Sequence, residues 1–201
     1  MTRALFDTAF KAARALHIEH SAVSEFTAWD DTAKWAKAAP HPTPCAQRLT
    51  TEAALAQGAS LSARAPFTAL APHARWRETY TDAEMFNGFN ARFGSFQLIG
   101  REGHFFSETT SSFVLYSDKD LWYPWHDHPA EELYLIVAGE AEFFAKGRPP
   151  QSLRPGDACY HASGQPHAMQ THTQPVLAYV LWRGDIRGKP RLTRPDRVPE
   201  G

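Results

Sequence analysis

The stretch from Tyr123 to Gly139 holds four side chains that could ligate a metal ion. They are His126, His128, Glu132 and Tyr134. A β-strand directs every second side chain to the same face, so we expect the two histidines to share one face and the glutamate and tyrosine to share another. Pro129, between the pairs, predicts a bend that folds one pair over the other. Two imidazoles and a carboxylate that converge in this way suit a divalent first-row metal with open coordination positions.

A metal site of this kind needs a further ligand and a cavity from the rest of the chain. Five of the ten histidines fall between Tyr123 and His172, which is the one anomaly in the composition. These five are His126, His128, His161, His167 and His172. The clustering therefore supplies candidate ligands on a second segment of the chain.

The remaining composition is that of an ordinary globular protein. The 201 residues suffice for one hydrophobic core, with 43% hydrophobic and 21% charged residues. The formal net charge is −1, so we expect no nucleic-acid partner and no anionic membrane surface. No apolar run has the length of a membrane span, and the charged N-terminal stretch does not match a secretory signal. The only two cysteines, Cys45 and Cys159, fit a reducing cytoplasm, which is where we expect the protein.

Helical periodicity dominates the first 93 residues. Apolar residues recur at spacings of three and four from Thr2 to Glu19, which predicts an amphipathic helix. A second helical pattern runs from about Ser24 to Ala38. We expect a short helix over Thr50–Gln57 and a loop over Gly58–Pro72, which is rich in Ala, Ser and Pro.

Closely spaced strands are predicted after the helical part. Thr81 and Glu84 form a capping box that predicts one more helix, from Asp82 to about Arg92. Short stretches with β-branched and aromatic residues then alternate with turn signals, which indicates an antiparallel sandwich or barrel. The predicted strands are Ser95–Ile99, Phe105–Glu108, Ser111–Tyr116, Glu132–Ala138, Glu140–Lys146, Ala158–His161 and Val176–Trp182.

The expected architecture is mainly β, with three parts. Residues 1–93 form a helical segment that packs on the barrel, lids it or makes a homodimer contact. Residues 94–185 form the barrel with the metal site. Residues 186–201 are basic and proline-rich, and we expect a loosely ordered tail there.

The spacing of the candidate ligands resembles the first motif of the cupin superfamily, a double-sheet jelly-roll barrel. The match is His126-x-His128-x3-Glu132-x6-Gly139. In the second motif, Gly156 and His167 hold the family positions, and the resemblance makes His167 the distal metal ligand. The chain departs from the pattern at three positions, where a glycine, a proline and an asparagine are replaced by Asp120, Ala162 and Thr171.

A narrower resemblance is to the cupin-type dimethylsulfoniopropionate (DMSP) lyases, and it runs from about Trp76 to Asp185. It is carried by YPWHxHPAEExY at Tyr123–Tyr134, QPHAM at Gln165–Met169 and VLWRG at Val180–Gly184. The resemblance implies cleavage of DMSP, a small zwitterion, to dimethyl sulfide and acrylate. It implies a metal on His128, Glu132 and His167, with His126 or Tyr134 completing the set. It also implies Tyr134 as the base and Tyr123 as its active-site partner.

The residue types suit a β-elimination. A base must remove the proton next to the substrate carboxylate while the sulfonium leaves from the β-carbon. Free tyrosine is mostly protonated at neutral pH, and a divalent cation beside Tyr134 would favour its phenolate. The cation would also act as a Lewis acid on the carboxylate. The sulfonium, like other onium cations, can rest on aromatic faces. For this role we name Tyr123 and Trp182 first, then Trp125 and Tyr160.

Several alternatives remain open at this point. The metal is zinc or iron, with manganese, nickel or cobalt also compatible with a His/Glu set. The same site could serve a cupin dioxygenase or isomerase that acts on another small carboxylate. A cupin that binds a ligand without catalysis would need neither the metal nor the tyrosine. In that case Tyr134 and the tryptophans would be packed core residues.

Overall fold

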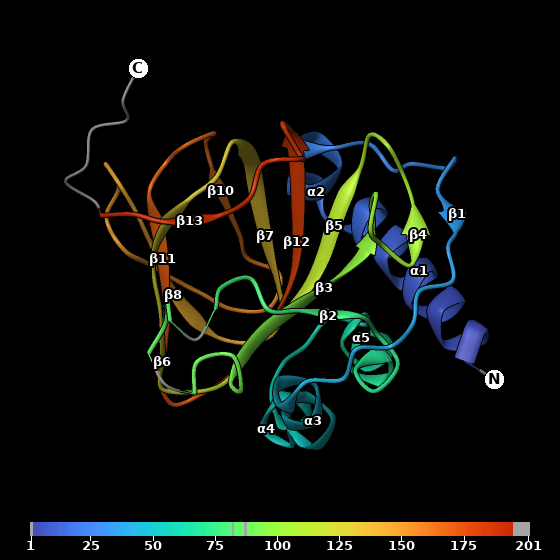
Figure 1. The fold of residues 1–201 in the computed structure, drawn as a ribbon, viewed down its shortest axis with the longest axis horizontal. Coiled ribbons are helices and arrows are strands. Elements are labelled where there is room, and N and C mark those ends of the chain that lie inside the picture. The colour runs from blue at the N-terminus through green and yellow to red at the C-terminus, as the bar shows by residue number, and fades with distance from the viewer. Residues whose placement is uncertain (1, 82, 87, 195–201) are drawn as a thin grey trace.

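Two mainly antiparallel sheets face each other and close into a barrel of the cupin type (Figure 1). The computed structural model describes residues 2–81, 83–86 and 88–194. Within these, the larger sheet has the strand order β1-β4-β3-β5-β12-β7-β10, with β2 paired to β3, and the smaller has the order β13-β6-β11-β8-β9. The larger sheet contains β1 (Lys34–Trp35), β2 (Trp76–Arg77), β3 (Phe93–Ile99), β4 (Phe105–Phe106), β5 (Ser111–Ser117), β7 (Ala130–Gly139), β10 (Ala158–His161) and β12 (Val176–Gly184). The smaller contains β6 (Leu121–Asp127), β8 (Ala141–Ala145), β9 (Gln151–Leu153), β11 (His167–Thr171) and β13 (Arg191–Leu192).

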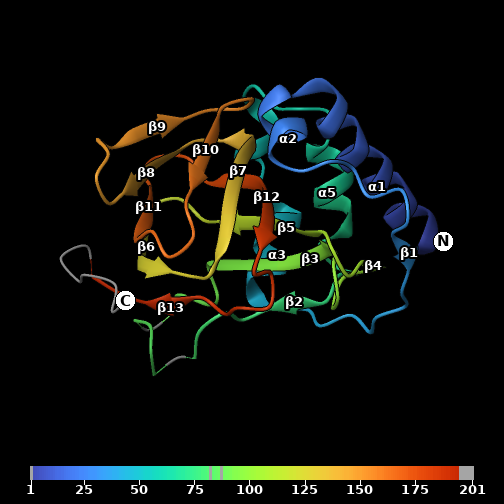
Figure 2. The ribbon, with the colours of Figure 1, turned by 90° about the horizontal axis from the view of Figure 1, so that it is seen from above.

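Helices cover the outer face of the larger sheet, on the side away from the smaller one (Figure 2). They are α1 (Thr2–Glu19), α2 (Ser21–Phe26), α3 (Pro44–Thr51), α4 (Ala54–Gln57) and α5 (Arg64–Leu70). In the described part of the chain, no helix is both long and apolar enough to cross a membrane.

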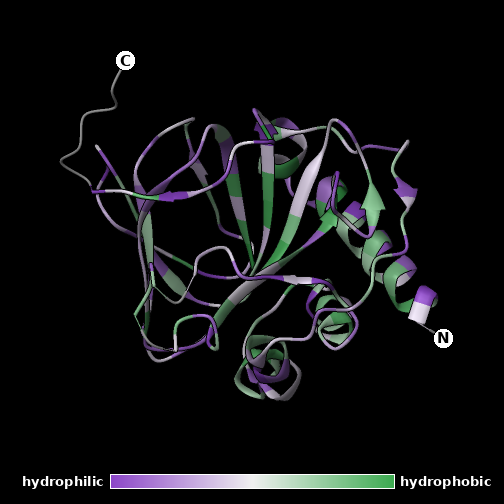
Figure 3. Ribbon diagram, viewed as in Figure 1, coloured by the Kyte–Doolittle hydropathy of each residue, from purple (hydrophilic) through white to green (hydrophobic). Residues whose placement is uncertain are grey.

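The larger sheet is buried on both faces, so it separates two hydrophobic cores. Along β7, Leu133 and Leu135 pack with the helices, while Tyr134 and Ile136 pack inside the barrel. This alternation follows from the period of two in a strand. Figure 3 shows the apolar character of β7 and β12 that this double burial requires.

The strands predicted within residues 95–182 are confirmed, with small changes at the ends, whereas β9 and β11 were not predicted. β4 is shorter than expected, because it ends at Phe106 rather than Glu108. The bend at Pro129 is also confirmed, since β6 ends at Asp127 and β7 begins at Ala130. Within the segment expected to be a loose tail, β13 pairs with β6, and residues 195–201 of that segment lie outside the described residues.

The helix predictions are only partly correct. α1 matches its predicted range. The predicted helix over Ser24–Ala38 is wrong: α2 ends at Phe26, and the chain then runs as coil into β1. The helix expected over Thr50–Gln57 is split between the end of α3 and the separate α4. Gly58–Pro72 is not a loop throughout, because α5 lies within it.

The capping box at Thr81 forms without a helix. The Thr81 backbone N–H and hydroxyl both donate to the Glu84 carboxylate at 2.8 Å. The described residues from 83 to 92 nevertheless form turns and bends, so the predicted helix is wrong; Asp82 and Asn87 lie outside the described residues. Met85 and Phe89 from this segment are buried in the barrel core. That burial fixes the local chain path in place of a helix.

Candidate metal centre and pocket

Strand register brings the predicted ligands together from both sheets. In the smaller sheet, His167 on β11 pairs directly with His126 on β6. In the larger sheet, Glu132 on β7 lies between Trp182 on β12 and His161 on β10. His128 follows β6 in the bend before β7. The site therefore lies between the sheets, with imidazoles on one side and a carboxylate on the other.

The candidate ligand atoms lie close together. The Nε2 atoms of His128 and His167 lie 3.2 and 3.1 Å from Oε2 of Glu132. One nitrogen from each of His126, His128 and His167 lies within 4.8 Å of the others. His128 Nε2, His167 Nε2 and Glu132 Oε2 are buried and make no well-formed hydrogen bond to the described residues. Buried polar atoms without partners are costly, and a shared divalent cation would satisfy all three. The donor set thus fits the implied metal.

Backbone carbonyls orient the three imidazoles. The Nδ1 atoms of His126, His128 and His167 lie 2.8, 2.9 and 2.8 Å from the carbonyl oxygens of residues 124, 130 and 165. A carbonyl only accepts hydrogen bonds, so each Nδ1 must carry the proton. Each Nε2 is then free to act as a metal ligand.

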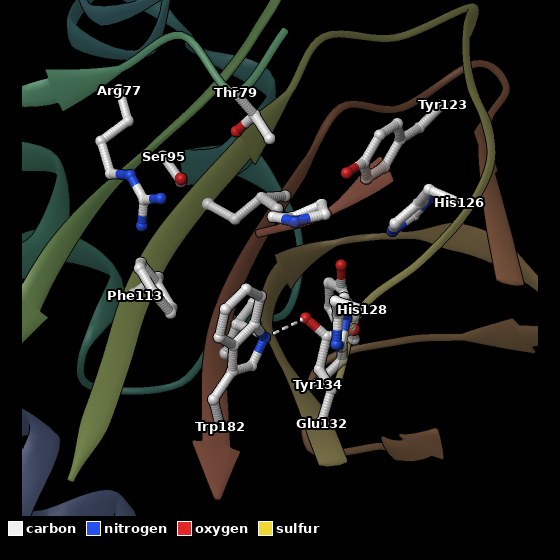
Figure 4. Close-up of a pocket in the computed structure, with 13 residues that line it drawn as sticks. Arg77, Thr79, Ser95, Phe113, Tyr123, His126, His128, Glu132, Tyr134 and Trp182 are labelled. Atoms are coloured by element: carbon white, nitrogen blue, oxygen red, sulfur yellow. Dashed lines mark hydrogen bonds and ion pairs between the residues drawn. The ribbon is translucent and has the colours of Figure 1, made fainter. Parts of the chain in front are cut away.

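Trp182 fixes the Glu132 carboxylate. Its indole Nε1–H donates to Oε1 of Glu132 at 2.7 Å, which leaves Oε2 facing the histidines (Figure 4). The Trp182 ring also packs 4.5 Å from the His128 ring, measured between centroids. Trp182 therefore touches two candidate ligands.

The electrostatics keep this carboxylate charged. Burial by itself would raise the pKa of Glu132, but His128 and His167 outweigh it and hold that pKa well below its usual range. Burial lowers the pKa of His126 well below the ordinary histidine value. A charged glutamate and a neutral imidazole are the protonation states in which these groups bind metals.

A pocket opens beside the cluster, with about 420 Å³ of space not filled by protein atoms, part of it open to solvent. Tyr123, Tyr134 and Trp182 all line it, so these three predicted site residues are brought together (Figure 4). Tyr123 stacks on the His126 ring at 4.0 Å. Burial raises the pKa of the Tyr134 phenol well above its ordinary value, and the Glu132 charge adds to this.

Two predicted substrate-binding residues do not line this pocket. Trp125 lies on the other face of β6 and packs near Phe144, 6.4 Å away between ring centroids. Tyr160 lies on the outer face of β10, where its hydroxyl donates to Glu131 at 2.8 Å. Strand alternation explains both placements, since each residue is one position away from an inward-facing histidine.

The two histidines outside the cupin motif differ in their surroundings. His161 is fully buried, and its ring stacks on His167 with centroids 4.1 Å apart. A nitrogen of His161 lies within 4.8 Å of donor atoms of Glu132 and His167. His172 is exposed and lies 3.2 Å from the Glu142 carboxylate. Only His161 is thus in contact with a candidate ligand.

Sequence reasoning missed the part of the pocket that comes from upstream of the motifs. The Tyr80 hydroxyl lies 3.2 Å from that of Tyr123, within hydrogen-bonding distance. Arg77, Thr79 and Ser95 line the pocket itself, and Tyr80 lies behind Tyr123. No motif spacing connects these residues to the histidines. The only available signal was the apolar and aromatic content of residues 76–96.

Comparisons with known proteins point to one family. The family model described as dimethylsulfoniopropionate lyase matches residues 17–178. The dimethylsulfoniopropionate lyase DddQ of Ruegeria pomeroyi is 40% identical over 183 residues, which cover 91% of each chain. The crystal structure of DddQ from the same organism superposes with a TM-score of 0.91 at 38% identity, over 97% of this chain and 99% of that one. A structure from a study of two DMSP lyases, RdDddP and RnDddQII, also gives a TM-score of 0.91, at 36% identity over 96% of this chain and all of that one. The chain therefore belongs to the dimethylsulfoniopropionate lyase family and has a cupin fold.

Proposed function

We propose that this chain is a metal-dependent carbon–sulfur lyase that cleaves DMSP to dimethyl sulfide and acrylate by β-elimination. The observation that carries the proposal is a cluster of three imidazole nitrogens beside a phenol in a pocket, with an ionised carboxylate oxygen 3.2 and 3.1 Å from two of those nitrogens. Family membership supports the substrate class.

His126, His128, Glu132 and His167 would hold the metal, with Tyr134 as the alternative to His126. When bound, a divalent cation supplies Lewis acidity toward the substrate carboxylate and favours ionisation of a nearby phenol. Zinc or iron suits this donor set, and manganese, nickel and cobalt remain alternatives.

Tyr134 would be the base that takes the proton next to the substrate carboxylate. Its phenol is buried and lies on the same strand face as Glu132, two residues away. Burial keeps this phenol protonated in the metal-free protein. Proton abstraction by Tyr134 should therefore require the bound metal.

Tyr123 and Trp182 would hold the sulfonium end of the substrate. Both line the pocket, and both present aromatic faces next to the ligand histidines. Aromatic faces attract onium cations, more strongly where water is excluded. Tyr123 would also restrain the position of His126 through their ring stack.

The test is release of dimethyl sulfide from DMSP by protein loaded with each first-row metal in turn. We expect release by the wild type and a loss of at least about a hundredfold in kcat for Tyr134→Phe. Tyr160→Phe is the matched control, because its hydroxyl lies on the outer face of the barrel. Absence of turnover with every metal would remove DMSP as substrate, and full activity of Tyr134→Phe would remove the base assignment. A requirement for oxygen would favour the dioxygenase alternative.

A further inference from the structure

A second, larger cavity adjoins the pocket and shares part of its wall. Both cavities are lined by Arg77, Phe113 and Trp182, so these three side chains form the junction between them. The outer cavity holds about 1100 Å³ of space outside protein atoms, part of it open to solvent. Anything that enters or leaves the pocket on this side must pass the Arg77 guanidinium.

The outer cavity is positively charged. Its lining contains four basic side chains and one acidic one. The basic residues are Arg77, Arg101, Arg187 and Lys189, and the acidic residue is Glu102. Arg101 is neutralised by an ion pair with Glu108, whereas Arg77 has no such partner among the described residues. A wall of this charge attracts anions.

The Arg77 guanidinium lies in an unusual environment for a cation. It is partly buried against the Phe113 ring, 5.1 Å from its centroid, and makes no hydrogen bond or ion pair through its side chain within the described residues. Burial lowers the pKa of Arg77, the negative charge of Glu102 partly opposes this without forming an ion pair, and the guanidinium remains charged at neutral pH. Ser95, its partner in the β2–β3 register, directs its hydroxyl to the same side of the pocket (Figure 4). A planar, unpaired guanidinium beside a hydroxyl matches the two oxygens of a carboxylate.

We propose that Arg77 and Ser95 form a second carboxylate-binding site at the junction of the two cavities, separate from the metal centre. The sulfonium end of DMSP does not explain Arg77, because two cations repel each other. A carboxylate at this position has two sources: the acrylate product on its way out, or the far end of a substrate longer than DMSP. The inference rests on the proposed function only in taking the inner pocket as the place of reaction.

Direct binding tests the site without turnover. Metal-loaded protein is titrated calorimetrically with acrylate, with propionate, and with the α,ω-dicarboxylates from malonate to adipate. We expect Arg77→Met to weaken binding of acrylate, of at least one dicarboxylate, or of both, by about tenfold, since a charge-assisted hydrogen bond to a carboxylate is lost. Arg77→Lys should weaken binding less than Arg77→Met does, because lysine keeps the positive charge but not the planar, two-pronged guanidinium.

Two controls separate a specific site from a general effect of charge. Arg101→Met removes an equal charge from the same cavity, but from a residue paired with Glu108, and should leave every affinity within about twofold. Propionamide, which is neutral, should not distinguish wild type from Arg77→Met. Melting temperature and circular dichroism verify folding. If Arg77→Met does not fold, Arg77→Lys and Ser95→Ala carry the test.

The results identify the source of the carboxylate. Weakened acrylate binding in Arg77→Met assigns the site to product, and a loss confined to dicarboxylates assigns it to a longer substrate. If no carboxylate loses more than about twofold, or if Arg101→Met has the same effect, the inference is overturned. Lack of dimethyl sulfide release together with Arg77-dependent binding would instead defeat the proposed function and leave this site standing.

Discussion

Two buried histidines outside the pocket should make the fold sensitive to acid. His17 on α1 and His104 before β4 are 5% and 1% exposed, and burial lowers the pKa of each from 6.5 to about 4. His104 Nε2 accepts the Arg75 backbone N–H at 3.1 Å, and its ring packs 4.2 Å from that of Phe6. Protonation of that nitrogen would break the hydrogen bond and bury a charge.

The direction and size of the effect follow from these pKa values. A histidine whose pKa is lower in the folded state stabilises the fold fully above pH 6.5, and this contribution is lost as the pH falls from 6.5 toward 4. A pH of 5 lies about 1.5 units below the pKa of a histidine in the unfolded chain, so that histidine is protonated there, while the folded one is still neutral. The free energy of unfolding should therefore fall by about 2 kcal/mol per histidine between pH 7 and pH 5. The pair would remove about 4 kcal/mol from a total stability of typically 5–15 kcal/mol.

Denaturant unfolding of wild type and His104→Gln at pH values from 7 to 5 measures this contribution. All other titratable groups are the same in both proteins, so the difference between the two unfolding free energies isolates His104. The variant should be less stable at pH 7, because its packing against Phe6 is lost, and the gap should narrow by about 2 kcal/mol by pH 5. His17→Gln should behave in the same way. Parallel pH profiles for wild type and His104→Gln would refute the argument.

Three further substitutions have defined outcomes. Trp182→Phe, which frees the Glu132 carboxylate to rotate, should weaken metal affinity by about 10- to 100-fold in a chelator competition assay, and unchanged affinity would contradict the orienting role. Gly139→Ala should lower the free energy of unfolding by more than about 2 kcal/mol in a urea titration. The reason is that Gly139 has a φ of +74° and a Cβ there would lie 1.8 Å from the Pro175 carbonyl oxygen. A variant as stable as wild type would disprove the clash. At Asp120, where φ is +50°, replacement by Gly should leave the free energy of unfolding nearly unchanged, while replacement by Val should lower it by about 1–2 kcal/mol in the same assay. Equal effects of the two replacements would show that the backbone is not strained there.

The barrel was predictable because its signals are local. Strands with a period of two and glycine-rich turns mark most of residues 95–182, and the resemblance to the cupin motifs singled out His126, His128, Glu132 and His167 as candidate ligands. Even a departure from the family pattern is intelligible: Asp120 replaces a glycine yet adopts the positive φ that the glycine would allow. Thr171, in the place of an asparagine, accepts the Leu121 backbone N–H at 3.0 Å with its hydroxyl.

The helical part was harder to predict because tertiary contacts decide it. Trp29 and Trp35 belong to the pattern that predicted a helix over Ser24–Ala38, but they pack against Phe10 and Phe6 from chain that is not helical. The capping box near Thr81 keeps its hydrogen bonds without a helix, since burial of the following aromatic residues in the barrel dominates. The pocket residues that come from β2 and β3 have no sequence motif, so only the fold could bring Arg77 to the site.

The hydrogen bonds from the ligand histidines to main-chain carbonyls make the proton arrangement of the centre resistant to mutation. Where an aspartate or glutamate side chain holds an imidazole, one codon change can release the ring. Here the acceptor oxygens belong to the peptide groups of residues 124, 130 and 165, which every amino acid supplies. Drift in the neighbouring side chains would thus leave the ring tautomers unchanged, and only a shift in the course of the chain itself could alter them.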